Sequence, residues 1–497
     1  MVVGAAIAVL VPGYWTGRGF PLDDAWIHMV YGRSLATSFA LDYNPGIPAT
    51  GATSLAWAVF VALPHLVSSD VSTIVFLVKV IGFCLHVATA LATFFAFDTG
   101  PQSRIIALLA ALLVVIYPPF ASASVSGMEL PAASLVAVLL LVAYRRRSVA
   151  AFAALAVLSP LVRPELTIVP IILAALSFGD GTRRESFHLF TAAAGGLALS
   201  WAGMIWRNLA VSGRPLAATI YAKARVGFAP HQFLDLLDAF PLLDAAPVGL
   251  LVAVSLYMAV VQLKARRSIP LGAASFLTGF AYFASASMSS WMGRTGGVHF
   301  YYWRYALPGV VLMIAGIFPL LDAVPLDGLK DRTRRWVRIA IPAAFFALAA
   351  LRSPAGYLWL HNDTANIDSI QVEIGKYLSR AKQTETAWVF DAGATRYFGT
   401  PFVVDLAGLN TLEMLKPDFQ SYLVSRPPNY IVQLAYVTGI DSDYLKEASV
   451  LEFHVDPTRY PAVPESIDER VIVCPPGVRG SLWLLRPDGE YRIDFQP

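Results

Sequence analysis

Long apolar stretches separated by short polar segments dominate the first 350 or so residues of the chain. A helix that crosses a bilayer needs about 20 mostly apolar residues, and Pro, Gly or flanking aromatic residues can extend a shorter core. On this basis the pattern predicts eleven membrane-spanning helices. They are Val2–Trp15, Val71–Phe97, Ile105–Tyr117, Leu130–Tyr144, Val149–Leu161, Leu166–Phe178, Phe187–Trp206, Val248–Leu263, Leu271–Met288, Phe300–Leu320 and Val337–Leu351.

A long loop, residues 16–70, separates the first two predicted spans and contains a further apolar piece, Ser54–Val67. This piece has 14 residues, which is short for a span, and counting it as one would reverse the side of every later loop. We therefore predict an interfacial or re-entrant helix here. A second interfacial helix is expected to begin near Asp23 and to run through Ala36.

The polar residues become frequent from about Ser353 onward, and no long apolar run follows. The sequence thus predicts a membrane domain over residues 1–352 and a small α/β domain over residues 353–497. The elements expected in the second domain are a helix at Ile367–Ala381 and strands at Ala387–Asp391, Tyr430–Leu434, Val471–Val473 and Leu482–Leu485.

Basic residues cluster in alternate short loops, which predicts the side of the membrane on which each loop lies. With the N-terminus in the cytoplasm, the inside loops contain Arg145-Arg146-Arg147, Arg183-Arg184 and the basic residues of segments 264–267 and 330–338. The external loops have scattered basic residues instead. Eleven spans from an inside start place the C-terminal domain outside the cytoplasm.

Composition supports a membrane protein. Of the 497 residues, 56% are hydrophobic and 14% are charged, and the mean hydropathy is +0.58. Soluble domains have about 25% charged residues, so a single soluble globule is excluded. The net charge of +3 points to no nucleic-acid partner, and two cysteines are too few for a disulfide framework.

Two adjacent carboxylates, Asp23 and Asp24, follow the exit of the first predicted span. Mutual repulsion and a nearby low dielectric raise the proton affinity of such a pair, which suits general-base catalysis. The alternative is structural, since an Asp before a helix accepts backbone N–H bonds as an N-cap. Both interpretations remain open from the residues alone.

The first loop contains Asp23-Asp24-Ala25-Trp26-Ile27-His28, then Tyr31-Gly32-Arg33 and Tyr43-Asn44-Pro45-Gly46-Ile47-Pro48, and then Gly51-Ala52-Thr53-Ser54. With these motifs it resembles the first loop of GT-C fold integral-membrane glycosyltransferases, especially bacterial arabinofuranosyltransferase-like members. The resemblance covers most of the chain, because further pieces follow in the order of that family. These further pieces are Ser126-Gly127-Met128-Glu129, Arg163-Pro164-Glu165, Thr219-Ile220-Tyr221-Ala222-Lys223-Ala224, Arg304-Tyr305-Ala306-Leu307-Pro308, Asp391-Ala392-Gly393-Ala394 and Val404-Asp405-Leu406-Ala407-Gly408-Leu409.

The resemblance implies an inverting glycosyltransferase of the bacterial cytoplasmic membrane. Such an enzyme takes a sugar, arabinofuranose being one candidate, from a polyprenyl-phosphate donor and adds it to a cell-envelope glycan or lipid on the outer face. The acceptor hydroxyl needs a base and the departing phosphate needs positive charge. We expect Asp23 to be the base and Asp24 to orient the acceptor or share a divalent metal, while the need for a metal is left open.

Four basic residues at external positions are candidates for binding the donor phosphate. Lys223 and Arg304 lead, because the loop around Lys223 contains no obvious acidic partner, and Arg163 and Arg225 follow. The alternative for all four is snorkelling or pairing with an acid at a span end. Arg163 is the residue most expected to have a structural partner, Glu165.

Three further residues are expected to bind substrate. Glu129 opens the fourth span, where an acid either compensates the helix dipole or binds a hydroxyl group. His28 lies one turn after Asp24 and is either structural or, with Asp24, a metal ligand. Tyr221 precedes Lys223 in its loop. In the tail, Asp391 and Asp405 lie at strand ends, where acceptor binding and loop capping are both possible.

Two other classes of function compete with the enzyme. Eleven spans also suit a secondary transporter or a flippase of lipid-linked sugars, but such proteins have repeated halves with interrupted helices near the midplane. Here the polar residues gather in external loops and a polar tail. A non-catalytic scaffold or sensor with an external domain is the third class. The distribution of polar residues favours the enzyme.

Overall fold

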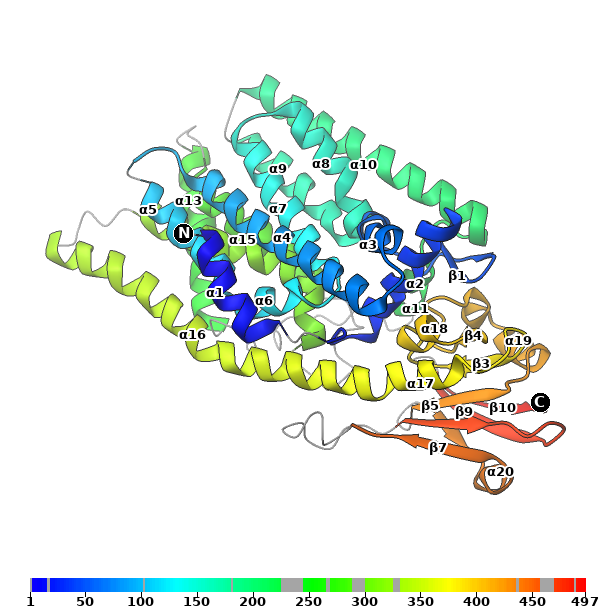
Figure 1. The fold of residues 1–497 in the computed structure, drawn as a ribbon. Helices are drawn as coiled ribbons and strands as arrows, with labels where there is room; N and C mark the ends of the chain where they lie inside the picture. The colour runs from blue at the N-terminus through cyan, green and yellow to red at the C-terminus, as the bar shows by residue number, and fades with distance from the viewer. Residues whose placement is uncertain are drawn as a thin grey trace. The chain divides into compact units, whose positions relative to one another are not determined.

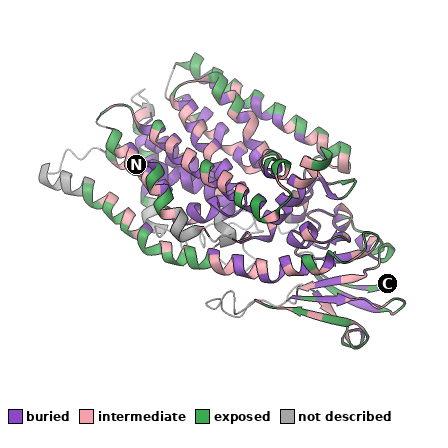
Figure 2. Ribbon diagram, in the orientation of Figure 1, coloured by how far each residue is buried: buried purple, intermediate pink, exposed green. Residues whose placement is uncertain are grey.

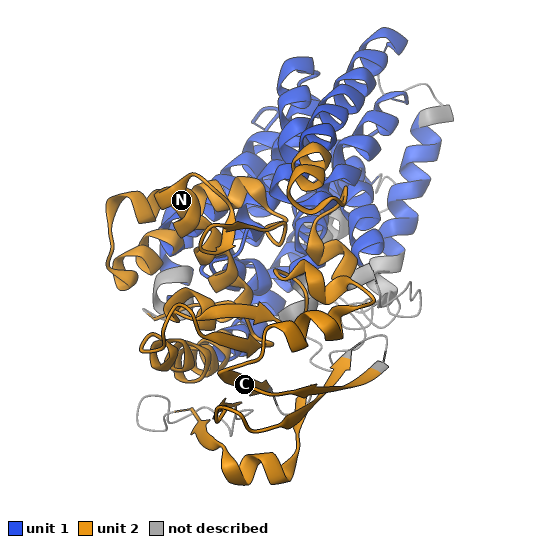
Figure 3. Ribbon diagram, turned by 90° about the vertical axis from the view of Figure 1, so that its right-hand side faces the viewer, with its two compact units in different colours: residues 1–15, 79–203, 227–359 blue, residues 16–78, 204–226, 360–497 orange. Residues whose placement is uncertain are grey.

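The structure of the chain, a computed structural model, describes residues 2–15, 18–101, 103–179, 182–224, 245–264, 269–287, 300–324, 331–434, 438–455, 469–486 and 489–497. The chain forms two compact units (Figure 3). The helical unit comprises residues 1–15, 79–203 and 227–359, and the loop–tail unit comprises residues 16–78, 204–226 and 360–497. The first loop therefore belongs to the same compact unit as the C-terminal tail.

Each of the eleven apolar stretches forms a helix, as the sequence predicts (Figure 1). These helices are α1 (Val2–Tyr14), α4 (Val71–Phe97), α5 (Arg104–Ile116), α7 (Leu130–Arg145), α8 (Val149–Val162), α9 (Ile168–Ser177), α10 (Arg183–Ser212), α13 (Ala245–Lys264), α14 (Leu271–Ser287), α15 (Phe300–Ala323) and α16 (Asp331–Ser369). The described part of the helical unit also contains a short helix that was not predicted, α6 (Pro118–Ser124), and a 3-10 helix, η1 (Pro164–Thr167), just before α9.

Four described helices are long and apolar enough to cross a membrane: α4, α10, and the apolar parts of α15 and α16. The pair α5 and α6, bent by 63° at Tyr117, makes a fifth if it is one broken span. The other apolar helices contribute described apolar segments of 10–17 residues, such as Leu250–Gln262 within α13. The chain thus has the helices of a membrane protein, and the number of spans stays a prediction.

The centre of the helical unit is the packing of α14 against α15, where glycines bring the two backbones together. A Cβ atom added at Gly279 would meet the backbone oxygen of Gly309, and one added at Gly309 would meet Gly279 in return. Seven residues away on each helix, a Cβ atom at Gly316 would meet the backbone oxygen of Gly272, and one at Gly272 would meet the backbone of Leu320. Small residues at such spacing allow close helix contact in membranes. Helix α15 is accordingly buried along most of its length, whereas α16 is largely exposed (Figure 2).

The loop–tail unit combines the first loop with an α/β tail. Its helices are α2 (Asp23–Ser38), α3 (Leu55–Val67), α11 (Ala218–Ala224), α17 (Gln371–Leu378), α18 (Ala394–Phe398), η3 (Leu412–Leu415), α19 (Phe419–Ser425) and α20 (Ser442–Glu447). Its strands are β1 (Asp42–Asn44), β2 (Ile47–Pro48), β3 (Thr386–Val389), β4 (Phe402–Asp405), β5 (Tyr430–Leu434), β6 (Thr438–Ile440), β7 (Ser449–Phe453), β8 (Glu469–Val473), β9 (Gly480–Arg486) and β10 (Gly489–Phe495).

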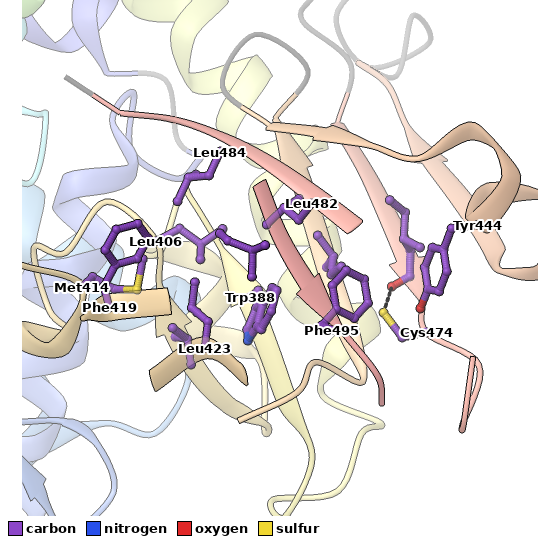
Figure 4. Close-up of a cluster of buried hydrophobic side chains, with 14 residues drawn as sticks. Trp388, Leu406, Met414, Phe419, Leu423, Tyr444, Cys474, Leu482, Leu484 and Phe495 are labelled. Atoms are coloured by element: carbon purple, nitrogen blue, oxygen red, sulfur yellow. Dashed lines mark hydrogen bonds between the residues drawn. The ribbon is translucent and has the colours of Figure 1, made fainter. Parts of the chain in front are cut away.

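The tail contains a five-stranded sheet in the order β4-β3-β5-β8-β7 and a three-stranded sheet in the order β10-β9-β6. Strand β3 is parallel to both β4 and β5, while β8 is antiparallel to its neighbours. The side chains of Trp388, Leu482 and Phe495 lie in the apolar core of the tail (Figure 4). Because β3, β4 and β5 are parallel, their carboxyl ends lie at the same edge of the sheet. The loop that follows β3 begins at this edge.

The helices at the start of the tail have other bounds than predicted. Helix α16 continues past residue 352 to Ser369, and the next helix, α17, begins at Gln371 rather than at Ile367. The helix therefore stays continuous across the change from apolar to polar side chains at Ser353. The helix ends where Ile370 departs from the preceding geometry, with φ −108° and ψ −76°.

Candidate active site

Asp23 and Asp24 lie in the first turn of α2, at the start of the first loop. The N-cap of this helix is Leu22, and no side chain caps it. The alternative that an Asp caps its own helix is therefore wrong. Instead, Asp23 binds the tail: Oδ2 accepts a hydrogen bond of 2.6 Å from the backbone nitrogen of Gly393, and Oδ1 accepts one of 2.7 Å from that of Ala394.

The loop between β3 and α18 is held by the first loop at a second point. The Tyr43 hydroxyl donates a 2.6 Å hydrogen bond to the backbone oxygen of Ala392. The side-chain amide of Asn44 pairs with both the backbone oxygen and the backbone nitrogen of Val403, in β4. The first loop therefore contacts β4 and the loop that leaves the carboxyl end of β3, and this end is where α/β sheets usually place their binding sites.

Burial and like charges raise the proton affinity of three acids in this region. Desolvation, followed by the charge of Asp391, raises the pKa of Asp23 well above its ordinary value, although the two backbone N–H bonds oppose the shift. Burial and the charge of Asp24 raise the pKa of Asp391 to about 6. Burial and the charges of Asp391 and Asp23 raise the pKa of Glu469. Such perturbed groups are typical of functional sites.

No three His, Cys, Asp or Glu side chains within the described ranges are arranged to hold a metal ion. His28, the other candidate ligand, is buried in α2, whereas Asp24 is partly exposed.

A second group of predicted residues comes together in the helical unit. Arg163 donates a 2.7 Å hydrogen bond to Oε1 of Glu129 and a 3.3 Å bond to the backbone oxygen of Arg304. Its Nε lies 3.4 Å from Glu165, which confirms the expected pair. Arg163 and Glu129 are both buried. Glu129 precedes the first residue of α7 but engages an arginine rather than capping that helix.

Arg304 lies near the start of α15 and is also buried. Its Nη2 donates a 2.7 Å hydrogen bond to the hydroxyl of Tyr305, and its guanidinium lies 4.8 Å from the centre of that ring. The guanidinium of Arg163 lies 5.2 Å from the same ring. Tyr305, which the sequence analysis did not single out, therefore contacts both cations.

The remaining candidates lie around α11. The hydroxyl of Tyr221 accepts a 3.4 Å hydrogen bond from the backbone nitrogen of Leu216, and its ring packs beside Leu415. The guanidinium of Arg214 lies 5.2 Å from the centre of the Tyr221 ring. The side chain of Lys223 and the whole of Arg225 lie outside the described residues.

Comparison with known proteins bears on the fold and on the tail. A family described as a domain of unknown function (DUF8728) matches residues 365–472. No curated protein sequence matches the chain.

Two kinds of solved structure are similar to the chain. ArnT from Cupriavidus metallidurans, bound to undecaprenyl phosphate, has a TM-score of 0.56 at 12% identity over 96% of this chain and 98% of its own. The oligosaccharyltransferase AglB from Archaeoglobus fulgidus, in complex with an inhibitory peptide and a dolichol-phosphate, has a TM-score of 0.54 at 12% identity over 87% of this chain and 68% of its own.

These likenesses define the class of fold. The chain has the GT-C fold, as the sequence resemblance implies, in the form of a mostly helical membrane protein with a small C-terminal sheet region. At 12% identity the comparison establishes the architecture alone.

Proposed function

We propose that this protein is an inverting glycosyltransferase that takes a sugar from a polyprenyl-phosphate donor and adds it to a cell-envelope glycan or lipid. The observation that carries the proposal is the cluster of carboxylates formed by Asp23, Asp24 and Asp391, in which the pKa values of Asp23 and Asp391 are raised, in a chain of GT-C fold. The solved structures of ArnT with undecaprenyl phosphate and of AglB with a dolichol-phosphate support a lipid-linked donor.

In this proposal Asp24 is the general base, and Asp23 holds the first loop on the tail. Both oxygens of Asp23 already accept backbone N–H bonds, while Asp24 is partly exposed and lies in the same helical turn. The acceptor oxygen attacks the anomeric carbon as Asp24 takes its proton. The bond from that carbon to the phosphate oxygen breaks, and the lipid phosphate leaves with the electron pair.

We further propose that Arg304 and Lys223 stabilise the departing phosphate, with Arg225 as a further candidate. Arg163 is less suited to this role, because two carboxylates, Glu129 and Glu165, already contact its guanidinium. It is better placed to fix the backbone of Arg304, whose carbonyl oxygen it binds. Positive charge near the leaving oxygen stabilises the transition state more than the bound donor.

The finer features of the proposal follow from the sequence. An arabinofuranosyl group is the first sugar to test. The basic inside loops predict that the tail and the first loop lie on the outer face of the bacterial cytoplasmic membrane. A lipid-linked donor stays in the bilayer while its sugar phosphate lies at that interface, so the reaction suits a site in the first loop.

The proposal is tested with purified protein in lipid vesicles. Labelled polyprenyl-phosphate sugars, arabinofuranose among them, are offered with a panel of envelope glycan and lipid acceptors. The expected result is transfer from at least one donor, which weakens at limiting donor when Arg304 is replaced by Gln. Movement of intact lipid-linked sugar across the vesicle bilayer without any transfer would instead establish a flippase.

A further inference from the structure

Gln371 connects two acids of the tail that lie on different elements. It is the first residue of α17, and its Nε2 donates a 2.7 Å hydrogen bond to Oε1 of Glu469, at the start of β8. The same nitrogen lies 3.3 Å from Oδ2 of Asp391, which follows β3. One amide group therefore fixes two carboxyl groups that would otherwise repel each other.

The arrangement leaves buried acceptor atoms without hydrogen bonds. Gln371 is 3% exposed and Glu469 is 1% exposed, and neither Oε1 of Gln371 nor Oε2 of Glu469 has a hydrogen-bond partner among the described residues. A buried polar atom without a partner costs free energy, so such atoms indicate a missing donor. The O–H group of a carboxylic acid or of an alcohol would supply the donor that these two oxygens lack.

The acids of this cluster differ in their exposure to solvent. Asp23 and Glu469 are buried, whereas Asp24 and Asp391 are partly exposed. The charge of Asp24 is close enough to raise the pKa of Asp391. The exposed side of the cluster is therefore formed by one carboxylate from the first loop and one from the tail.

Building on the proposed function, we infer that Asp391 is a substrate-binding carboxylate that accepts hydrogen bonds from the hydroxyl groups of the acceptor beside Asp24. Gln371 and Glu469 are positioning residues that act on Asp391 without contacting the acceptor. The amide of Gln371 fixes the Asp391 carboxylate by direct contact, and Glu469 fixes the amide.

The surroundings of Asp391 also define the chemistry of the acceptor. The charged groups that act on it and on its neighbours are Asp23 and Asp24 from α2 and Glu469 from β8. An anionic group would be repelled by these carboxylates, whereas neutral hydroxyl groups can donate to them. We therefore infer that the acceptor presents an uncharged, hydroxyl-rich sugar at this position, and that its attacking hydroxyl belongs to such a sugar.

Two variants test the inference in the transfer assay. Asp391→Asn keeps the size of the side chain and removes its charge, so the KM for a neutral glycan acceptor should rise by about 10-fold or more, as expected for loss of hydrogen bonds to a charged group. The KM for the donor should stay unchanged. Asp443→Asn is the matched control, because Asp443 lies on the surface of the tail and pairs there with Lys446.

The pH–rate profile of Gln371→Met distinguishes a positioning role of Gln371 from a merely structural one. The Gln371 amide lowers the pKa of Asp391, so its loss should raise that pKa and shift the acidic limb of the pH–rate profile to higher pH. Asp443→Asn, at the surface pair with Lys446, should keep the wild-type profile.

The outcomes separate this inference from the proposed function. Transfer by the wild-type protein combined with unchanged acceptor KM in Asp391→Asn, or with an unmoved pH profile in Gln371→Met, would overturn the role of Asp391 and leave the glycosyltransferase intact. Equal use of a phosphorylated acceptor and its neutral counterpart would overturn the inferred substrate class. Failure of the wild-type protein to transfer any sugar would overturn both.

Discussion

Oδ2 of Asp23 lies 2.6 Å from the backbone nitrogen of Gly393, although 370 residues separate the two along the chain. With the second bond to Ala394, this contact uses both oxygens of the first carboxylate in the loop. Asp23 therefore has a structural task that is separate from any role in chemistry. A substitution at Asp23 therefore alters the contact between the first loop and the tail as well as any catalytic role of the residue.

Asp23→Asn should destabilise the protein as well as reduce activity. Asn has one carbonyl oxygen, so its amide NH2 would face the backbone N–H of Gly393 or Ala394 and leave a buried donor unsatisfied. The expected cost is about 1–3 kcal/mol, which is the usual penalty for such a group. Thermal unfolding in detergent measures it against Asp443→Asn. A melting temperature equal to that of the control would contradict the contact between Asp23 and the tail.

Gly393→Ala should displace the first loop from the tail. A Cβ atom at this position would meet the backbone oxygen of Asp23 and lie 2.8 Å from both of its carboxylate oxygens. The backbone cannot yield without breaking the two hydrogen bonds, so we expect faster proteolysis of the first loop and a large loss of transfer activity. Gly439→Ala is the control, since a Cβ there would make an ordinary 3.5 Å contact with Trp483. Similar behaviour of the two variants would count against the contact.

Arg163→Ala should cost stability in the helical unit. Its removal leaves Glu129 buried without its 2.7 Å ionic partner, and breaking one side of a buried ion pair typically costs about 3–5 kcal/mol. Arg492→Ala breaks an ion pair that is largely exposed, so it should cost about 1 kcal/mol or less. The measurement is thermal unfolding of both variants in the same detergent. Equal melting temperatures would show that the Arg163 pair is not structural.

Asp405 should make stability fall as pH rises from about 4 to about 6. Burial raises its pKa to about 6 despite hydrogen bonds from Ala407 and Asn410. In that pH range the folded chain binds more protons at Asp405 than the unfolded chain, so the free energy of unfolding decreases with pH. Asp405→Asn should flatten this slope. An unchanged dependence of the melting temperature on pH in the variant would contradict the shift.

Apolar runs in the sequence were sufficient to predict most of the fold. Helix α4 has the predicted bounds, Val71–Phe97, and β5 has the predicted bounds, Tyr430–Leu434. Such elements are specified locally by the length and period of their apolar residues. The helices expected in the first loop are also present, as α2 and α3.

Contacts between distant segments could not be predicted in the same way. The sequence suggests Glu165 as the partner of Arg163 because it is two residues away. The shorter bond, however, joins Arg163, at the end of α8, to Glu129, at the start of α7. The sequence indicates Asp391 as a candidate site residue, because an acid after a strand is a common ligand position. Gln371 carried none, because a glutamine at the start of a polar helix is ordinary on the surface.

The most direct test of the account is the rate of sugar transfer by Asp24→Asn. Labelled sugar is followed from its polyprenyl phosphate to the acceptor by the wild-type protein, Asp24→Asn and Asp443→Asn in the same vesicles. Because Asn cannot take the proton, Asp24→Asn should be slower by about 10²- to 10⁴-fold, the usual loss when a general base is removed, while the control stays at the wild-type rate. Transfer by Asp24→Asn at the rate of the control would contradict the proposal that this first-loop carboxylate is the base.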